Sequence, residues 1–528
     1  MYTNKIITEN EVVTVTEEFA TMPDGVRLYT RYAVPKGAEK CPVVYMRTPY
    51  EKAHDGVPHD IEEYKNNSFI KHGYAVLLQH CRGRGDSEGE CVPCVEREDG
   101  LATIDFIRSL PFYNGEIFPY GGSYLSLVHL SYLDTKPHDV KGAYLFIQPD
   151  RKFFRNYQNG CNYKLNNATW WCNMLNRRFP EQKREELYKL PYVEAAKRVF
   201  GVDVPEYTDT LIHNTLDDYW TSSPAWGATW NAIDTLSVPT LFVEGWFDYY
   251  VDGMTDMWER IPSETKKRCA MVIGPYGHGT NVSTLAEYPL ENGALPVGHA
   301  ADWFDSIREG RPYPHFETGK ITYYSLGGAR WRAVEYPCET GAQKRFWLGK
   351  GGQLTADRTD GEALSYVYDP TNAESPYKSG NIYRAHKVGT VDGILSFVSA
   401  PFEKEESFFG KIKLHLNVSS DCEDTAFFAR IYLGEDGEDY NLTETVGSLS
   451  YLVGDYTPGD KVAIEFETPP VAFTAKKGAR VRVDISSVTS VYVPHANVKG
   501  HFAYVTETKV ANNTIYTEDS YLDIAYEL

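Results

Sequence analysis

Cysteine is scarce in this chain. The 528 residues include nine cysteines, a low density and an odd number, so no disulfide framework is implied and the cytoplasm is the expected location. Cys91 and Cys94 form one C-x-x-C pair. A second pair at zinc spacing is missing, which favours two loop thiols over a metal site.

Long apolar runs are missing as well. No stretch approaches the length of a membrane span, and the N-terminal segment MYTNKIITENEVVTV lacks the basic and apolar regions of a secretory signal. Positive charge is in deficit, because 53 Lys and Arg stand against 73 Asp and Glu, a formal net charge of −20. A surface this acidic repels phosphate backbones, so we expect neither nucleic acid nor a membrane as a partner.

The chain is long and rich in aromatic residues. At 528 residues it is too long for one core, and its length predicts roughly two to four domains. Aromatic residues make up 14%, with 39 tyrosines. This content favours strand-rich regions and aromatic-lined pockets.

The first part of the chain alternates between strand-like and helical patterns. Alternating residues on both sides of a turn at 22–25 predict an antiparallel hairpin. The short apolar runs 42–46, 75–78 and 143–147 are typical of buried parallel strands. Residues 98–110 carry an apolar stripe at helical spacing. Together these patterns predict a parallel sheet with covered faces.

The character of the sequence changes twice further along. Residues 151–230 are rich in Asn, Arg, Trp and Tyr at helical spacing, and strand-like runs resume at 238–243 and 269–273. A mostly helical insertion in the sheet domain is the simplest account. After about residue 310, alternating segments separated by turn signals predict an all-β domain of sandwich or jelly-roll type.

Ser123 is the first candidate for chemistry. The strand-like segment 117–120 leads into Gly121-Gly122-Ser123, and a helix-compatible run follows over 124–133. A serine on such a tight turn exposes its Oγ atom, and the helix N-terminus offers N–H groups to an oxyanion. The alternative is a glycine-rich turn on which Ser123 only caps the helix. Taken alone, the two interpretations are equally supported.

Asp248 and His278 supply the groups that a serine nucleophile needs. Each lies just past a buried strand-like run, where sheet proteins build their sites. Singly, Asp248 could be a helix N-cap and His278 a loop histidine. The chain order Ser, acid, His is the order found in α/β-hydrolases, so the ordered set favours nucleophilic catalysis by Ser123.

Four segments of the chain resemble one set of motifs, with Ser126 in place of a Gly and Tyr276 in place of a Trp. The motif G-x-S-Y-x-G corresponds to 121–126, G-W-x-D to 245–248 and G-P-W-x-H to 274–278, while R-G-x-x-x-S-x-G corresponds to 82–89. On these motifs the chain resembles, over nearly its whole length, the cocaine esterase and Xaa-Pro dipeptidyl-peptidase (CocE/NonD) family of α/β-hydrolases. Glutaryl acylases and α-amino-acid ester hydrolases belong to the same family.

The resemblance implies the fold and its division into domains. The fold class is α/β, with an α/β-hydrolase core, an inserted helical cap and a C-terminal β jelly-roll domain. The core takes residues 1–147 and 236–312, the cap 148–235 and the jelly roll 313–528. Members of the family are often dimers, so by analogy we expect a homodimer. No metal and no organic cofactor is expected.

The resemblance also implies an oxyanion hole made by the Tyr50 hydroxyl and the Tyr124 N–H. Tyr50 follows the strand-like run 42–46, and a phenol near a developing alkoxide can replace one backbone donor. The alternative is a loop tyrosine that only packs. The functional interpretation is favoured because no HGGG-type segment offers another donor.

The chain departs from the family at several places, and the last two of those described below bear on the substrate. Ser126 stands where the nucleophile motif usually has Gly. In α-amino-acid ester hydrolases, acidic residues follow the catalytic Asp by two and three positions and bind the substrate ammonium. Tyr250 and Val251 occupy those positions here, which disfavours an α-amino ester. The long additional N-terminal domain of the Xaa-Pro peptidases is also missing.

We therefore predict a serine hydrolase that cleaves a small-molecule ester or amide, or a short peptide, through an acyl-enzyme. An Xaa-Pro dipeptidyl-peptidase is the main alternative. A non-catalytic carbohydrate-binding protein and a metal hydrolase are weaker ones, because the Ser–Asp–His set is intact and no ligand pair has metal spacing. We expect the residues between the cap and the core to select the substrate. Candidates for an aromatic wall, with core packing as the alternative for each, are Trp170, Trp171, Trp220 and Tyr250.

Overall fold

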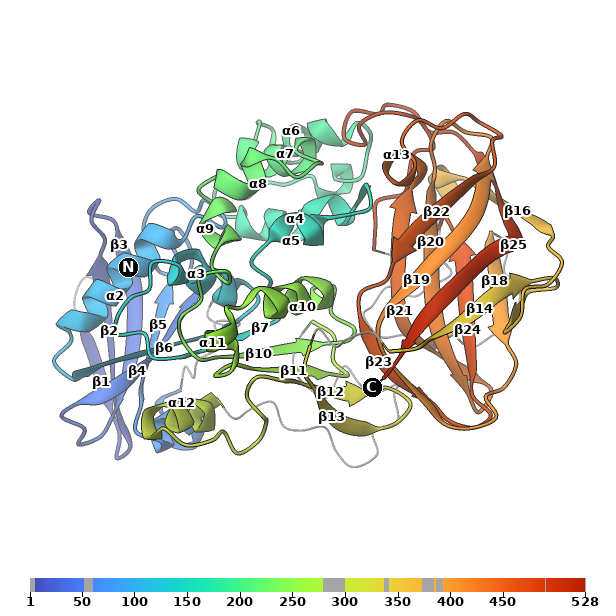
Figure 1. Cartoon of the computed structure of the whole chain (residues 1–528). Coiled ribbons are helices and arrows are strands. Elements are labelled where there is room, and N and C mark those ends of the chain that lie inside the picture. The colour runs from blue at the N-terminus through green and yellow to red at the C-terminus, as the bar shows by residue number, and fades with distance from the viewer. Residues whose placement is uncertain are drawn as a thin grey trace.

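The computed structural model describes residues 5–51, 60–278, 300–336, 341–372, 384–385, 393–489 and 491–527. An α/β core carries the N-terminus, helices cover one end of it as a cap, and a β domain follows at the C-terminus (Figure 1). The predicted fold class is confirmed. No helix in the described part of the chain combines the length and apolar character needed to cross a membrane.

One sheet of eleven strands forms the core. Its middle, from β5 to β12, is parallel throughout, and antiparallel strands complete both edges. Across the sheet the strands are β1 (Ile6–Glu9), β2 (Val13–Thr21), β3 (Arg27–Pro35), β5 (Ala75–His80), β4 (Cys41–Thr48), β6 (Tyr113–Gly122), β7 (Ala143–Phe146), β10 (Thr240–Gly245), β11 (Ala270–Gly274), β12 (Ile321–Ser325) and β13 (Arg330–Val334).

Helices cover both faces of this sheet. Along β4, Val43 and Tyr45 pack into one apolar cluster while Val44 and Met46 pack into another, because successive side chains of a strand point to opposite faces. Strands buried on both faces have the continuous apolar runs that the sequence shows. The first face is covered by α2 (Arg97–Ser109), α3 (Tyr124–Leu133) and α10 (Val251–Arg260), and the second by α1 (Ser68–Lys71) and α12 (Ala300–Glu309).

The local predictions for the core are confirmed where the structure describes them. β2 and β3 form the antiparallel hairpin around the turn at 22–25, and α2 occupies the predicted helical stretch 98–110. The sheet also continues through β12 and β13, beyond residue 312, where the sequence prediction ends the core. The predicted domain bounds themselves stay predictions.

The cap is a group of short helices that packs on α3. Its apolar interior includes Trp171, Tyr207 and Trp220, and it is continuous with Leu127 and Val128 of α3. Its elements are α4 (Lys152–Asn156), β8 (Tyr157–Gln158), β9 (Cys161–Asn162), α5 (Lys164–Met174), α6 (Ala195–Phe200), α7 (Pro205–Ile212), α8 (Asp218–Ser222) and α9 (Gly227–Trp230).

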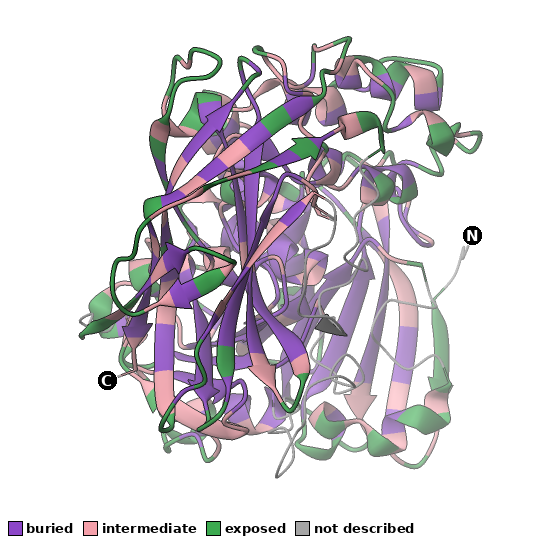
Figure 2. Ribbon diagram, turned by 90° about the vertical axis from the view of Figure 1, so that its right-hand side faces the viewer, coloured by how far each residue is buried: buried purple, intermediate pink, exposed green. Residues whose placement is uncertain are grey.

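The C-terminal domain is a twelve-stranded sheet that curls around its own apolar interior (Figure 2). In β19 the residues Ile412, Leu414 and Leu416 are buried and the residues between them are not, as the alternating pattern predicts. Its strands are β14 (Gln343–Gly349), β15 (Gln353–Thr355), β16 (Ala363–Tyr368), β17 (Arg384–Ala385), β18 (Ile394–Ser399), β19 (Glu406–Ser420), β20 (Ala426–Glu435), β21 (Glu438–Ser448), β22 (Val462–Glu467), β23 (Val471–Ala475), β24 (Arg480–Ser486) and β25 (Ala511–Tyr526).

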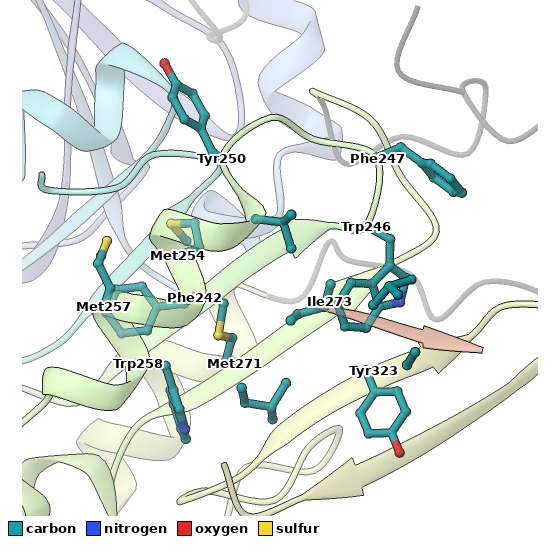
Figure 3. Packing of buried hydrophobic residues seen from close by; sticks show 14 of the residues in the cluster. Phe242, Trp246, Phe247, Tyr250, Met254, Met257, Trp258, Met271, Ile273 and Tyr323 are labelled. Atoms are coloured by element: carbon teal, nitrogen blue, oxygen red, sulfur yellow. The ribbon is translucent and has the colours of Figure 1, made fainter. Parts of the chain in front are cut away.

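Trp246 joins the core to the C-terminal domain. It is 4% exposed and lies near Tyr323 of the core sheet (Figure 3). Its ring centre is 6.3 Å from that of Tyr323 and 6.2 Å from that of Phe409 in β19. Its Nε1–H donates to the Tyr324 carbonyl at 2.7 Å. Because Trp246 lies two residues before Asp248, the same contact fixes the start of the loop that carries this acid.

We expect Trp246→Ala to lower the free energy of unfolding by about 3–5 kcal/mol, because it empties a large buried volume and removes a buried hydrogen bond. Urea denaturation would measure the change. The exposed Tyr504→Ala is the control, with an expected change within about 0.5 kcal/mol. A loss below about 1 kcal/mol for Trp246→Ala would contradict this interface role.

Candidate active site

Ser123 lies on the sharp turn between β6 and α3, as the sequence predicts. Its backbone has φ 53° and ψ −124°, a conformation that residues other than glycine rarely adopt. The two preceding glycines make room for this turn. A Cβ on Gly122 would lie 2.0 Å from the Phe146 ring, and one on Gly121 would lie 2.5 Å from Leu125. The turn therefore presents Oγ above the sheet edge.

Asp248 and His278 follow the neighbouring parallel strands β10 and β11. Gly245 and Gly274 are paired at the ends of these strands, and the two loops stay in contact beyond them. The Trp246 N–H donates to the Gly274 carbonyl at 2.9 Å, and the Phe247 N–H donates to the Tyr276 carbonyl at 3.0 Å. This pairing brings the acid and the histidine to one edge of the sheet, beside the turn of Ser123.

The three predicted side chains are connected by hydrogen bonds. His278 Nδ1 lies 2.8 Å from Asp248 Oδ2, and His278 Nε2 lies 3.0 Å from Ser123 Oγ. The Asp248 side chain is fully buried, whereas that of His278 is 26% exposed. A carboxylate that accepts from Nδ1–H leaves Nε2 free to accept the serine proton. The arrangement has the geometry of a nucleophile, a general base and an orienting acid.

Backbone and aromatic contacts hold the acid and the base in place. The Tyr250 N–H donates to the second carboxylate oxygen of Asp248 at 3.0 Å. The Tyr249 ring stacks on the His278 imidazole, with ring centres 5.0 Å apart and planes inclined by 17°. These contacts hold the Asp248 carboxylate and the His278 imidazole in one orientation. Proton transfer from Ser123 to His278 requires such a fixed orientation.

Tyr50 and Tyr124 lie where the sequence predicts an oxyanion hole. Tyr50 lines the same cavity wall as Ser123 and Trp170, and burial raises the pKa of its phenol, which keeps it a neutral donor. Tyr124 is the first residue of α3, so its N–H has no acceptor within the helix. Both residues thus line the cavity wall that contains Ser123.

The side chain of Tyr124 anchors the turn from behind. Its hydroxyl donates to Glu96 Oε1 at 2.7 Å and accepts from the Cys94 N–H at 2.7 Å. Glu96 is itself paired with the buried Arg47 at 3.0 Å. Ser126, the departure from the family motif, also braces the turn, because its hydroxyl accepts from the Phe146 N–H at 3.0 Å.

A cavity of about 250 Å³ opens between Ser123 and the cap. This volume is close to the lower end of the range for small-molecule sites, roughly 300–1,000 Å³. Trp170, Trp171 and Tyr250 line the cavity, as proposed for an aromatic wall, whereas Trp220 is fully buried in the interior of the cap. The predicted nucleophile, base and hydroxyl donor, Ser123, His278 and Tyr50, all reach its wall.

Glu244 is a residue that the sequence analysis missed. It is fully buried at the end of β10, where Oε1 accepts the Gly245 N–H at 2.7 Å. Burial and the neighbouring Asp248 carboxylate raise its pKa well above the usual value, which favours the protonated form of Glu244. Its place in the apolar run 238–245 was a signal, because a buried strand seldom carries a carboxyl group without a role.

Fold and site together define the class of protein. A mostly parallel sheet, a strained serine turn after β6, and an acid and a histidine after later strands are the features of the α/β-hydrolases. Comparisons with known proteins narrow this class.

The sequence matches the X-Pro dipeptidyl-peptidase (S15) family over residues 24–280 and the X-Pro dipeptidyl-peptidase C-terminal non-catalytic domain over 314–523. Cocaine esterase of Rhodococcus sp. (strain MB1 Bresler) is 22% identical, over 90% of this chain and 87% of its own. The chain belongs to the cocaine esterase and X-Pro dipeptidyl-peptidase (CocE/NonD) family, as its motifs predict, and it is a serine hydrolase of that family.

Solved structures agree on the fold. An α-amino acid ester hydrolase superposes with a TM-score of 0.80 at 19% identity, covering 99% of both chains. An aminopeptidase from the marine sediment archaeon Thaumarchaeota archaeon has a TM-score of 0.77 at 17% identity, covering 98% of both chains. A CocE/NonD family hydrolase from Staphylococcus aureus has a TM-score of 0.69 at 15% identity, covering 99% of this chain and 96% of its own.

The raised pKa of Glu244 has a measurable consequence for stability. An acid whose pKa is raised by folding destabilises the fold increasingly as pH rises from its unfolded pKa toward its folded pKa. We expect Glu244→Gln, which cannot ionise, to gain stability over the wild type between pH 5 and 8, by up to about 1.4 kcal/mol per pH unit. Urea denaturation at both pH values measures the difference. An equal difference at the two pH values would show that Glu244 is ionised in the fold.

Proposed function

We propose that the protein hydrolyses a small-molecule ester or amide through an acyl-enzyme on Ser123. The observation that carries this proposal is the hydrogen-bonded series Ser123–His278–Asp248 at the wall of a cavity of about 250 Å³. Membership of a hydrolase family supports it, as does the similarity to cocaine esterase, an esterase by name.

Each step of the reaction has a residue to perform it. His278 Nε2 takes the proton of Ser123 while Oγ attacks the substrate carbonyl, and Asp248 stabilises the imidazolium that forms. The Tyr50 hydroxyl and the Tyr124 N–H donate to the oxyanion of the tetrahedral intermediate. His278 then protonates the leaving group, and the acyl-enzyme is hydrolysed by a water that the same histidine activates.

An Xaa-Pro dipeptidyl-peptidase is the second candidate, and the family description favours it. Such an enzyme needs a carboxylate for the ammonium of a peptide N-terminus. Among the described residues, no Asp or Glu lines the cavity. A panel of p-nitrophenyl esters beside Xaa-Pro anilides separates the two candidates, because cleavage of the anilides alone would reverse their order.

A metal hydrolase has little support in the described part of the chain. One group there, His72, Asp302 and Asp305, brings its ligand atoms within 4.8 Å of one another. None of these residues lines the cavity that contains Ser123. Instead, His72 Nδ1 lies 2.5 Å from Asp305 Oδ2, and Asp302 Oδ2 lies 3.0 Å from His315 Nε2.

We expect Ser123→Ala to abolish labelling by a fluorophosphonate probe and to lower kcat/KM for a p-nitrophenyl ester by about 10⁴-fold or more, because no other group can form the acyl-enzyme. Gel fluorescence and a chromogenic assay measure the two effects. Ser222→Ala, an exposed serine of the cap, is the control and should keep both label and activity. Equal labelling of wild type and Ser123→Ala would refute the nucleophile.

The second donor of the oxyanion hole can be tested by removing one atom. Tyr50→Phe should lower kcat by about 10²–10³-fold with little change in KM, because the hydroxyl acts on charge that develops in the transition state. Steady-state kinetics with the same ester measure both parameters. Tyr188→Phe, at an exposed cap tyrosine, is the matched control. A kcat of Tyr50→Phe within about threefold of the wild-type value would show that the Tyr50 hydroxyl does not stabilise the oxyanion.

A further inference from the structure

Two basic side chains of the cap line the cavity beside Ser123. Lys152 and Arg155 both lie on α4, and their spacing places them on the same side of the helix. Lys152 is 7% exposed, and its Nζ donates to the Tyr250 hydroxyl at 3.0 Å. The centre of the Tyr250 ring lies 4.5 Å from Lys152 Nζ and 5.4 Å from Arg155 Cζ. The two basic groups therefore pack on one aromatic ring at the cavity wall.

Neither Lys152 nor Arg155 has a carboxylate partner within the described residues. The acid next to them in the sequence, Asp150, pairs with Arg260 at 2.6 Å. Arg155 donates to the neutral Asn156 side chain at 2.8 Å, and its Nε atom is buried without a hydrogen-bond partner in that part of the chain. A buried charge without a partner is costly, because it has lost its water and gained no ion in return.

The surroundings of Lys152 favour its neutral amine. Burial, followed by the positive charge of Arg155, lowers the pKa of Lys152 well below its usual value. Cys94 and Asp248 act in the opposite direction, but the Asp248 carboxylate is already engaged by His278 at 2.8 Å. A neutral lysine amine is a nucleophile, so Lys152 is a candidate for covalent modification at the cavity.

Arg155 restricts the kind of modification that fits. A reaction that only neutralised Lys152 would leave the Arg155 guanidinium without a counter-charge. A reaction that turns the amine into a planar anion would instead give this guanidinium a partner, which it can bind through two parallel hydrogen bonds. Carbon dioxide forms such an anion on a neutral amine. It is small and uncharged, so it can enter a cavity of about 250 Å³ without the desolvation cost of an ion.

We propose that carbon dioxide carbamylates Lys152 and that the carbamate forms an ion pair with Arg155. The Nζ lone pair forms a bond to the carbon of carbon dioxide, the electron pair of one C=O π bond moves onto oxygen, and Nζ releases one proton to solvent. The product is R–NH–COO⁻, with no change of oxidation state. The Tyr250 hydroxyl, beside Nζ, is a further donor to it. No Asp or Glu of the described chain lines this cavity to repel the new charge.

The modification bears on catalysis by Ser123, and in this respect the inference rests on the proposed function. The Tyr249 ring stacks on the His278 imidazole and has its centre 5.5 Å from the Arg155 guanidinium. A cation without a partner there opposes the imidazolium that His278 becomes when it takes the serine proton. The carbamate offsets that cation, so we expect the carbamylated enzyme to be the faster form.

Nuclear magnetic resonance tests the covalent bond directly. Protein labelled with ¹⁵N-lysine is incubated with ¹³C-bicarbonate, which supplies carbon dioxide. We expect a protein-bound ¹³C resonance that is split by coupling to one directly bonded ¹⁵N nucleus. A bound resonance without this splitting would come from an adventitious ion only and would overturn the proposal, as would the absence of any bound resonance.

Variants assign the resonance to its residue. Lys152→Met should remove the resonance, whereas Lys183→Met, which removes an exposed lysine from the same cap, should keep it. Arg155→Met should weaken it about tenfold, because the carbamate loses its charge-assisted hydrogen bonds. A split resonance that persists in Lys152→Met would overturn the site. Because wild type must itself show the split resonance, the proposal stays testable even where Lys152→Met does not fold.

One further variant separates this inference from the proposed function. Ser123→Ala should keep the split resonance, since Ser123 takes no part in the reaction of the amine with carbon dioxide. If the resonance is present while wild type hydrolyses no ester, carbamylation stands and the hydrolase proposal fails. If wild type hydrolyses esters and the resonance is absent, the hydrolase proposal stands and carbamylation fails.

Kinetics measure the effect of the carbamate on turnover. In wild type freed of carbon dioxide, added bicarbonate should raise kcat/KM for a p-nitrophenyl ester about threefold or more, because the carbamate offsets the charge that opposes the His278 imidazolium. Sodium chloride at the same ionic strength is the control. Lys152→Met should not respond to bicarbonate. A kcat/KM that bicarbonate leaves unchanged in wild type would overturn this effect on catalysis.

Discussion

The parallel pairing of β10 with β11 is the constraint on which the rest of the site depends. This pairing places Gly245 beside Gly274, and backbone hydrogen bonds continue between the loops that follow the two strands. Asp248 and His278 therefore lie at the same edge of the sheet. β6, separated from β10 only by β7, brings Ser123 to this edge as well. A change of register in one of these strands would separate groups whose distances are now 2.8 and 3.0 Å.

Buried ionisable groups lie on both sides of the hydrogen-bonded series Ser123–His278–Asp248, and their surroundings differ. Behind Asp248, the raised pKa of Glu244 favours the neutral form of a second carboxyl group, which lessens the like charge next to Asp248. In front, Lys152 and Arg155 remain without a described counter-charge at the cavity. The interior next to the acid thus favours the neutral form of a second carboxyl group, while two basic side chains line the cavity. The fold supports this expensive arrangement through the cap, which is itself bound to the C-terminal domain by hydrogen bonds such as that of the Ser448 N–H to the Asn159 carbonyl at 3.0 Å.

Much of the core could be predicted because its signals are local. Continuous apolar runs mark β4, β5 and β11, and helical spacing marks α2 and α3. The candidate residues Ser123, Asp248 and His278 follow from the positions of such strands and from family motifs. Lys152 and Arg155 carried no comparable signal, and Glu244 was marked only by its place in an apolar run. A charged side chain shows in the sequence neither how deeply it is buried nor which groups face it, and both depend on elements far apart in the chain.

The sequence by itself determined the α/β core with its C-terminal β domain, the family, and the order of the nucleophile, acid and base candidates. These features can be predicted from the periodicity of apolar residues and from short motifs. Both are local in the sequence and do not depend on contacts between distant segments. Only the tertiary structure decided that the three candidates touch, that Trp220 packs inside the cap while Trp170 lines the cavity, and that two basic side chains line the cavity beside Ser123. Those outcomes depend on how the cap lies over the sheet, since contact and burial are set by packing between segments that the sequence keeps apart.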